Sequence, residues 1–441
     1  MNHQDSDLLI NCDYMLSMDQ VDCPVLENQT VAVKDSKITF IGKKGSYSGR
    51  AKKTIEAKNK ILMPGLINGH CHMAMTLFRG IGDDQNLNDW LHNVIFPLEA
   101  KHVHEDFIKI GVNLALAESI KSGVCTLLDM YFYTELSAQL VDHAGLRALI
   151  GEGVCNFPTP GNRDYDGSDF KRLSENIESY KEHDRITPCI APHAPYTCSD
   201  DLLKKCADFA RKNSIPLSIH LAETKTELEG QLKEHKKSPT RRLYDLSIMD
   251  TSKTIFAHAI HVDDKDIALI KKSASSVVHN PESNMKLGSG IMPFSKYLDA
   301  GVDVGLGTDG AASNNNLNLF GEMSTAAKLQ KLNAKEPGNI GAKEMLYAAT
   351  LGGAKALGLG DSTGSIELGK KADLILLNTR TPNFYPLTDL RSQLVYASTG
   401  DEVDTVICNG KILMEKRELK TIDEDKILDE AQDFYDKNLK T

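Results

Sequence analysis

Two histidines, His70 and His72, form an H-x-H pair directly after an apolar, glycine-containing run at 64–69. In an extended segment the residues at i and i+2 point the same way, so both imidazoles can reach one metal ion. The chain has 14 histidines, and a pair of this kind taken alone is more often a surface or core feature. The run that precedes the pair favours a strand that enters a tight site.

Further along the chain, two more side chains could complete a metal site. His220 follows an apolar run and can act as a third neutral ligand, with Glu223 close by as a proton shuttle. Asp309, flanked by glycines within 305–310, can act as the fourth. Three histidines and one carboxylate suit Zn²⁺, and Fe²⁺ is compatible with the same ligand types. Each residue also has an ordinary interpretation, a satisfied polar residue or a turn, so the hypothesis depends on their joint placement.

The elements that must position these residues are visible in the middle of the chain, about 66 to 365. Short apolar runs alternate there with helical segments such as 104–122, 200–212 and 342–357. This alternation predicts a parallel sheet with crossover helices, and eight strands in about 250 residues fit a (β/α)8 barrel of the TIM type. The expected strands are 61–68, 124–130, 147–154, 186–192, 216–219, 254–257, 275–278 and 302–307.

Six of these eight runs end in histidine or aspartate. In a barrel the carboxyl ends of the strands surround one mouth, where the chemistry takes place. The sequence therefore predicts a single site at that mouth, built from His70, His72, His193, His220, His258, His279 and Asp309.

Both ends of the chain are rich in β-type sequence. The first 60 residues contain short β-rich runs, and 372–377 and 403–414 resemble them, with an Asn409-Gly410 hairpin signal in the second. We expect one small β-sandwich from 1–65 and 366–441, beside a barrel at 66–365. The stretch 424–437 is predicted to be an exposed helix.

The composition limits the classes of partner. The chain has 441 residues, 51 basic and 61 acidic side chains and a net charge of −10, which argues against nucleic acid or an anionic membrane. No apolar stretch approaches the roughly 20 residues that cross a bilayer, and the N-terminus lacks the pattern of a secretory signal. The nine cysteines are irregularly spaced without C-x-x-C, so a disulfide framework is not expected. We expect a cytoplasmic protein with a small-molecule partner.

Longer motifs surround the same residues, and with them the chain resembles the amidohydrolase superfamily, and within it the 5′-methylthioadenosine/S-adenosylhomocysteine deaminases. The resemblance covers nearly the whole chain and implies a (β/α)8 barrel with a β-sandwich from both termini. It also implies one Zn²⁺ per subunit held by His70, His72, His220 and Asp309. Members with two metals typically carry a lysine at the end of strand four, which ends here at His193. The motifs are 64–72, 75–80, 192–198, 220–224, 257–261, 279–288 and 307–315.

The implied activity is hydrolytic deamination of an adenine ring, which releases ammonia and gives the inosyl product. By this resemblance Asp309 accepts the proton of the metal-activated water, and Glu223 protonates the ring nitrogen next to the attacked carbon. His258 stabilises the developing oxyanion. His261 is a competing candidate for that last role.

The resemblance also suggests substrate contacts. Glu99 matches an acid that binds the ribose hydroxyls, since two acceptor oxygens suit a vicinal diol, and His193 would contact the nucleoside. Ser313 and Trp90 would line the pocket, with 82–93 as either a lid or a packed helix. Arg147 resembles an arginine that reaches the amino-acid carboxylate of S-adenosylhomocysteine, and a second carboxylate contact could come from Arg163.

Alternative functions remain at this point. The same mechanism could act on guanine, another purine or a triazine. A barrel without catalytic activity could serve in assembly, and barrels of this kind commonly form homo-oligomers. A small cytidine-type zinc deaminase needs H-x-E followed by P-C-x-x-C, but after Pro188 and Cys189 the position of the second cysteine is Pro192, so that alternative is discarded.

Overall fold

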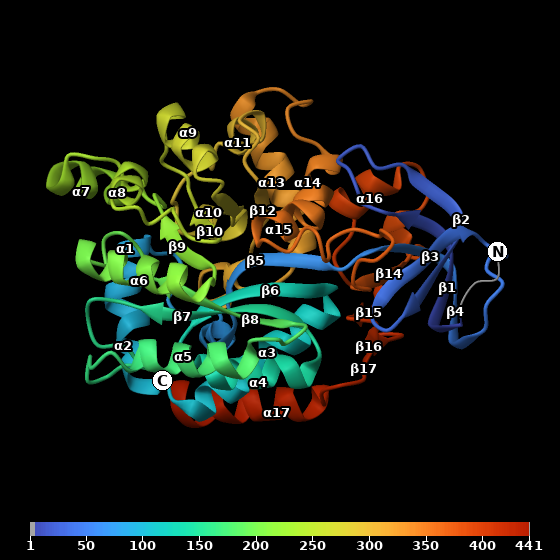
Figure 1. Cartoon of the computed structure of the whole chain (residues 1–441), viewed down its shortest axis with the longest axis horizontal. Helices are drawn as coiled ribbons and strands as arrows, with labels where there is room; N and C mark the ends of the chain where they lie inside the picture. Colours follow the sequence, from blue (N-terminus) through green and yellow to red (C-terminus); the bar gives the residue numbers. More distant parts are fainter. Residues whose placement is uncertain (1–4, 441) are drawn as a thin grey trace.

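The computed structural model describes residues 5–440 and contains two sheets. A parallel sheet with its helices fills the left and centre of Figure 1, and the second sheet lies on the right. Residues 1–4, which belong to the expected N-terminal strand region, lie outside the described residues.

The parallel strands close into the predicted barrel. Strand β12 pairs with β11 and strand β13 pairs with β5, so β12 and β13 are two parts of an eighth strand interrupted at Gly307-Thr308. Strands β6 and β7 are buried along their whole length, as expected for parallel strands covered on both faces. The barrel strands are β5 (Leu66–His72), β6 (Val124–Tyr131), β7 (Arg147–Val154), β8 (Ile186–Pro192), β9 (Leu217–Leu221), β10 (Thr254–His258), β11 (Ser276–His279), β12 (Val304–Leu306) and β13 (Asp309–Gly310).

Helices connect these strands and cover the outside of the barrel. Those that cross between strands or extend the loops at the mouth are η1 (Met73–Phe78), α1 (Leu87–Trp90), η2 (Leu91–Ile95), α2 (Phe96–His102), α3 (Glu105–Lys121), α4 (Thr134–Ala144), α5 (Ser168–Tyr180), α6 (Asp200–Asn213), α7 (Lys225–His235), α8 (Pro239–Asp245), α9 (Asp264–Lys272), α10 (Pro281–Lys286), α11 (Phe294–Asp299), α12 (Ala311–Asn314), α13 (Leu319–Ala334), α14 (Ala342–Ala348) and α15 (Leu351–Ala356).

Two expected elements are divided in the structure. The run at 61–68 belongs partly to β4 (Ala51–Pro64) of the second sheet and partly to β5, because the chain passes between the sheets at Gly65. A Cβ atom at Gly65 would lie 2.2 Å from the Cys125 sulfur, so only glycine fits this crossing. The expected helix at 342–357 is α14 and α15, interrupted at Thr350, whose φ of −130° and ψ of −104° are not helical.

The second sheet has eight strands from both chain ends, in the order β17-β16-β15-β14-β4-β1-β2-β3. The buried side chains of its own core come almost entirely from these strands, and Lys37 of β3 pairs with Lys371 just before β14. The sheet thus folds onto itself as the expected sandwich does. The remaining strands are β1 (Ser6–Leu16), β2 (Val25–Lys34), β3 (Lys37–Lys43), β14 (Leu374–Asn378), β15 (Val403–Cys408), β16 (Lys411–Glu415) and β17 (Glu418–Leu419).

Local turn chemistry and the C-terminal helix define the end of the chain. Asn409 and Gly410 both have positive φ, 50° and 75°, as the predicted two-residue hairpin requires. Helix α17 (Glu424–Phe434) runs beneath the barrel (Figure 1) and packs on α3, where Phe434 lies 5.7 Å from Phe107 between ring centroids. The prediction of an exposed helix is therefore wrong for one face, which buries Ile427 and Phe434. Two further short C-terminal elements are η3 (Pro382–Phe384) and α16 (Leu390–Tyr396), and η4 (Tyr435–Leu439) continues α17.

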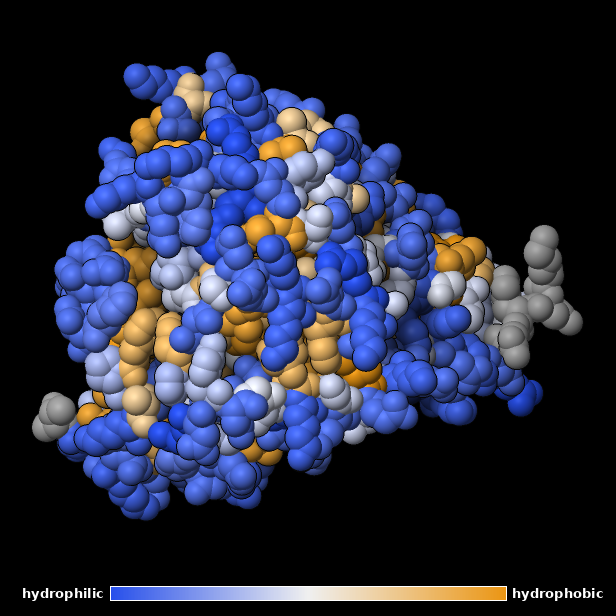
Figure 2. Space-filling model, turned by 60° about the vertical axis from the view of Figure 1, so that its left-hand side comes forward, coloured by the Kyte–Doolittle hydropathy of each residue, from blue (hydrophilic) through white to orange (hydrophobic). Residues whose placement is uncertain are grey.

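The surface is largely polar. In Figure 2, where the left-hand side of Figure 1 comes forward, hydrophilic side chains dominate and apolar ones gather in the middle of the face. Within residues 5–440, every helix is too short or too polar to cross a membrane. All nine cysteines are buried and carry free thiols.

Candidate metal centre and active-site cavity

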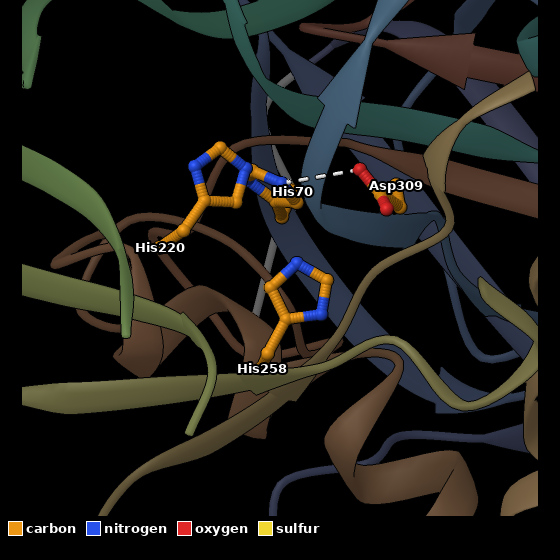
Figure 3. A group of neighbouring side chains, drawn as sticks. All are labelled: His70, His220, His258 and Asp309. Atoms are coloured by element: carbon orange, nitrogen blue, oxygen red, sulfur yellow. Dashed lines mark ion pairs between the residues drawn. The ribbon is translucent and has the colours of Figure 1, made fainter. Parts of the chain in front are cut away.

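Four side chains from separate strands converge at the barrel mouth. His70 ends β5 with His72, His220 lies in β9, His258 ends β10 and Asp309 begins β13. The ligand atoms of His70, His220, His258 and Asp309 all lie within 4.8 Å of one another. Figure 3 shows the three rings and the carboxylate facing a common space. His72 joins the group, since its ring centroid is 4.8 Å from that of His70 and its Nε2 is 3.0 Å from Asp309 Oδ1.

His70 is the clearest indication that this group suits a cation. Its side chain is 1% exposed, and neither ring nitrogen has a hydrogen-bond partner. A buried polar group without a partner is costly and calls for an explanation. Burial lowers the pKa of His70 to about 4, so the ring is neutral near pH 7, the form that binds metal. The donor set of imidazoles and one carboxylate therefore fits a divalent metal ion.

Hydrogen bonds orient the other imidazoles. The Nδ1 of His72 lies 2.5 Å from the Met130 carbonyl, and that of His220 lies 2.6 Å from the His193 carbonyl. Each contact assigns the proton to Nδ1 and leaves Nε2 as the free donor of an electron pair, as metal-binding histidines require. His258 is held in the same way, with Nδ1 2.7 Å from Asn284 Oδ1.

Asp309 is oriented by two serines. Its Oδ2 accepts hydrogen bonds from Ser283 at 2.6 Å and Ser313 at 2.9 Å, which directs Oδ1 towards the histidines. Burial raises the pKa of Asp309, but the neighbouring rings of His70 and His72 outweigh this and hold the pKa well below its usual value. The expectation that Ser313 lines the pocket is wrong, because its hydroxyl is used on Asp309 and it lies outside the cavity wall.

A cavity of about 460 Å³ opens above this centre. Glu99 is one of its few charged groups; it accepts a hydrogen bond of 2.7 Å from the Tyr131 hydroxyl, and burial raises its pKa to about 7. Glu223, His193 and Trp90 also line the wall. The cavity is otherwise mainly apolar, with Leu87, Leu91, Ile95, Phe96, Phe132, Phe157, Pro158 and Pro160.

One helical segment supplies much of this wall. It runs through α1, η2 and α2, and η2 is a π-type turn, a feature frequent at functional sites. Trp90 is only 6% exposed and faces the cavity. The expected lid region 82–93 therefore contributes to the pocket, and the segment continues to Ala100.

The prediction that Arg147 contacts substrate is wrong. Arg147 begins β7, so it lies at the end of the barrel opposite the mouth, and it is 4% exposed. Its Nε donates to Asp373 Oδ2 at 2.9 Å, which ties the barrel to the residue before β14. Arg163 does line the cavity, and its guanidinium donates to the carbonyls of Ala100 and Val103 at 3.1 and 3.0 Å.

The contacts of three histidines decide whether each one faces the cavity. His261 uses Nε2 on the Ser289 carbonyl at 2.8 Å and lies outside the cavity wall. His258 lines the cavity, and its Nε2 is 3.9 Å from Glu223 Oε2. His279 is buried beside Phe294, 5.8 Å between centroids, and lies outside the wall.

Reasoning from the sequence missed several contributors. Tyr131, Tyr196 and the phenylalanines of the wall are ordinary apolar residues by pattern, and only the fold places them together. Ser283 and Asn284 lie within the 279–288 motif, which was noted for its resemblance without roles for these side chains. Their position directly after a strand end was the available signal.

Comparison with known proteins agrees with this geometry. Residues 61–413 match the model of the Amidohydrolase family. A 5-methylthioadenosine/S-adenosylhomocysteine deaminase from Carboxydothermus hydrogenoformans is 43% identical over 405 residues, 91% of this chain and 92% of that protein. A 5′-deoxyadenosine deaminase from Methanosphaera stadtmanae is 40% identical over 407 residues, 92% of this chain and 94% of that protein.

A solved structure extends the comparison to the fold. An adenosine deaminase from Xanthomonas campestris with bound zinc superposes with a TM-score of 0.94 at 35% identity, covering 98% of this chain and 99% of that one. The barrel and the second sheet from both chain ends thus recur in that solved structure. This chain belongs to the amidohydrolase family.

Proposed function

We propose that this protein is a metal-dependent aminohydrolase that deaminates the adenine ring of 5′-methylthioadenosine or S-adenosylhomocysteine and releases ammonia and the inosyl product. The observation that carries the proposal is that Glu223, Glu99 and most of the His/Asp cluster line one cavity. The cluster residues in its wall are His72, His220, His258 and Asp309. The relatives with about 40% identity, named for deamination of such nucleosides, support it.

His70, His72, His220 and Asp309 are the proposed ligands of one Zn²⁺, and Fe²⁺ suits the same donors. His258, and not His72, belongs to the group of four residues whose ligand atoms all lie within 4.8 Å of one another. We assign it to the substrate side because its Nε2 also faces Glu223. A divalent ion bound by these residues would lower the pKa of a water molecule from about 15.7 towards about 7.

The protein's own groups then move the protons. Asp309 accepts a proton from the attacking water, with Oδ2 held by Ser283 and Ser313. Burial raises the pKa of Glu223, which favours a protonated side chain that can donate to the ring nitrogen beside the attacked carbon. His258 faces the oxyanion that develops on that carbon. Proton return to the exocyclic amine releases ammonia.

Substrate orientation depends on the outer wall. Glu99 is proposed to accept hydrogen bonds from the two ribose hydroxyls, beside Tyr131. His193 would contact the nucleoside, and Trp90 would cover the 5′ side of the sugar. Arg163 places a guanidinium group in the cavity wall. A carboxylate on the 5′-substituent of the substrate would form an ion pair with it.

A substrate panel tests the proposal. Zinc-loaded protein is assayed for ammonia release from 5′-methylthioadenosine, S-adenosylhomocysteine, adenosine, guanine and a triazine. Turnover of an adenosine derivative is expected, and turnover of guanine or the triazine alone refutes the proposed substrate class. Protein that stays metal-free after zinc supplementation would instead favour a non-catalytic scaffold.

The nine free thiols support a cytoplasmic location, and sedimentation would determine whether the chain forms a homo-oligomer.

A further inference from the structure

A second glutamate, Glu227, lies one helical turn beyond Glu223. It is in the first turn of α7 and its side chain is buried at 6% exposure. Its Oε1 accepts the N–H of Ala222 at 3.0 Å, and its Oε2 accepts the N–H of Glu223 at 2.8 Å. Both carboxylate oxygens are therefore used on the two peptide groups that carry Glu223.

These peptide groups need such support because Ala222 has a left-handed backbone, with φ of +47°. A residue with a Cβ atom adopts this conformation only where its surroundings impose it. The Ala222 carbonyl is held from the other side, since it accepts the N–H groups of Ile260 at 3.1 Å and His261 at 2.9 Å. The turn after β9 is thus clamped between Glu227 and the neighbouring turn after β10.

Glu227 does not act as an ordinary helix cap. In a capping box the glutamate three residues after the N-cap reaches back to the N-cap N–H. Asp266 does this for Asp263 in α9 at 3.2 Å, and Glu344 does it for Gly341 in α14 at 2.8 Å. In α7 the N-cap is Thr224, but the Glu227 side chain passes it and binds the two residues before it.

We propose that Glu227 is a positioning residue for the deamination, which holds the strained Ala222 turn so that the Glu223 carboxyl points into the cavity. This inference rests on the proposed function, in which Glu223 is the proton donor. Glu227 lies outside the wall of the 460 Å³ cavity that Glu223 lines and faces a neighbouring cavity. Because both of its carboxylate oxygens are used on the Ala222 and Glu223 N–H groups, it acts through Glu223. Burial raises the pKa of Glu227 to about 8, and the two peptide donors partly offset this.

The test compares Glu227→Gln with Glu344→Gln in the full, zinc-loaded chain. The glutamine at 227 keeps one acceptor oxygen but turns an NH₂ group towards the other peptide N–H. We expect kcat for the best substrate of the wild type to fall at least 20-fold, with KM within threefold and one metal ion still bound per chain. Glu344→Gln makes the same change at an ordinary cap contact outside the cavity wall, where the remaining amide oxygen can still accept the Gly341 N–H, and should keep kcat within twofold.

A second readout does not depend on activity. Hydrogen exchange measured by mass spectrometry should show the amides of Ala222 and Glu223 exchanging at least tenfold faster in Glu227→Gln than in the wild type. Unchanged exchange, or a kcat within threefold of the wild type, overturns the inference. If the wild type deaminates none of the panel, the proposed function fails, and the exchange result still decides whether Glu227 holds the turn.

Glycine at position 222 provides a rescue experiment. Glycine adopts positive φ without a penalty. The kcat of the double variant Ala222→Gly/Glu227→Gln should therefore be at least fivefold higher than that of Glu227→Gln. The absence of recovery would overturn the link between the strained turn and the aim of Glu223. A loss of kcat in Glu344→Gln as large as that in Glu227→Gln would show a general effect of capping and also overturn it.

Discussion

Replacing Arg147 by methionine distinguishes a role in the fold from a role in substrate binding. The guanidinium makes two contacts with Asp373, at 2.9 Å through Nε and 3.3 Å through Nη2, and donates to the Asp184 carbonyl at 2.6 Å. Asp373 is 3% exposed and also accepts bonds from Thr363 and from the Asn409 N–H. The change leaves this carboxylate buried without its counter-ion.

Breaking a buried ion pair by removing one partner costs about 3–5 kcal/mol. Unfolding entropy is about 2.1 cal/mol/K per residue, or roughly 0.9 kcal/mol/K for a chain of this length. If the chain unfolds as one unit, we expect Tm to fall by roughly 3–5 °C. Because Arg147 is remote from the mouth, the ratio of kcat/KM for 5′-methylthioadenosine to that for S-adenosylhomocysteine should stay within twofold.

The assay combines differential scanning calorimetry with kinetics on both substrates. The matched control is the double variant Arg147→Met/Asp373→Asn, which removes both charges and should regain at least half of the lost Tm. Arg163→Met, at the cavity wall, is the comparison for substrate choice. If Arg147→Met keeps its Tm but loses tenfold more activity on S-adenosylhomocysteine than on 5′-methylthioadenosine, the structural assignment of Arg147 is refuted.

Three further perturbations address the metal and the substrate, and a fourth addresses pH. Ser283→Ala removes the 2.6 Å bond to Asp309 and should weaken zinc binding about 10–100-fold, measured against a competing chelator; unchanged affinity contradicts this role. Glu99→Gln loses a charged acceptor worth about 1.5–3 kcal/mol, so KM for nucleosides should rise roughly 10–100-fold while kcat changes little. Protein from which metal has been removed by a chelator should gain about 4 kcal/mol of stability when zinc is added at about 1,000 times its Kd. This gain is measured as a higher Tm, and an unchanged Tm would argue against a metal site. Burial raises the pKa of Asp373, but Arg147 outweighs this and lowers it below its usual 3.8; the stabilisation is complete above that pH and is lost as pH falls through the lower value. Acid titration of the Arg147→Met/Asp373→Asn variant should therefore show a smaller loss of stability below that pH than the wild type does.

The strand positions were predictable because each is a local pattern. The runs at 147–154 and 186–192 match β7 and β8 without change, since apolar β-type residues between turn signals define a buried parallel strand. The errors occur where tertiary contacts override the local pattern. The run at 61–68 is continuous in sequence, but Gly65 lies against Cys125 and the chain changes sheets there.

For the site, residue type and position at a strand end were sufficient to predict a metal centre at the barrel mouth. Strand polarity made this possible, because carboxyl ends of parallel strands meet at one rim. The same rule places Arg147, the first residue of the run 147–154, away from the mouth, whereas the resemblance had suggested a substrate contact for it. Arg147 lies in the same strand as cavity residue Gly153, yet at the opposite end of the barrel.

The amino-acid sequence alone was enough to predict the class of fold, a set of candidate metal ligands and their convergence at one mouth. Three-dimensional packing was needed to show that Ser313 donates to Asp309, that Arg147 pairs with Asp373 and that Glu227 accepts the N–H of Glu223. The difference arises because a ligand type and a strand period are properties of neighbouring residues. The partner of a buried polar group is instead chosen by packing between segments far apart in the chain, where every donor and acceptor must be satisfied.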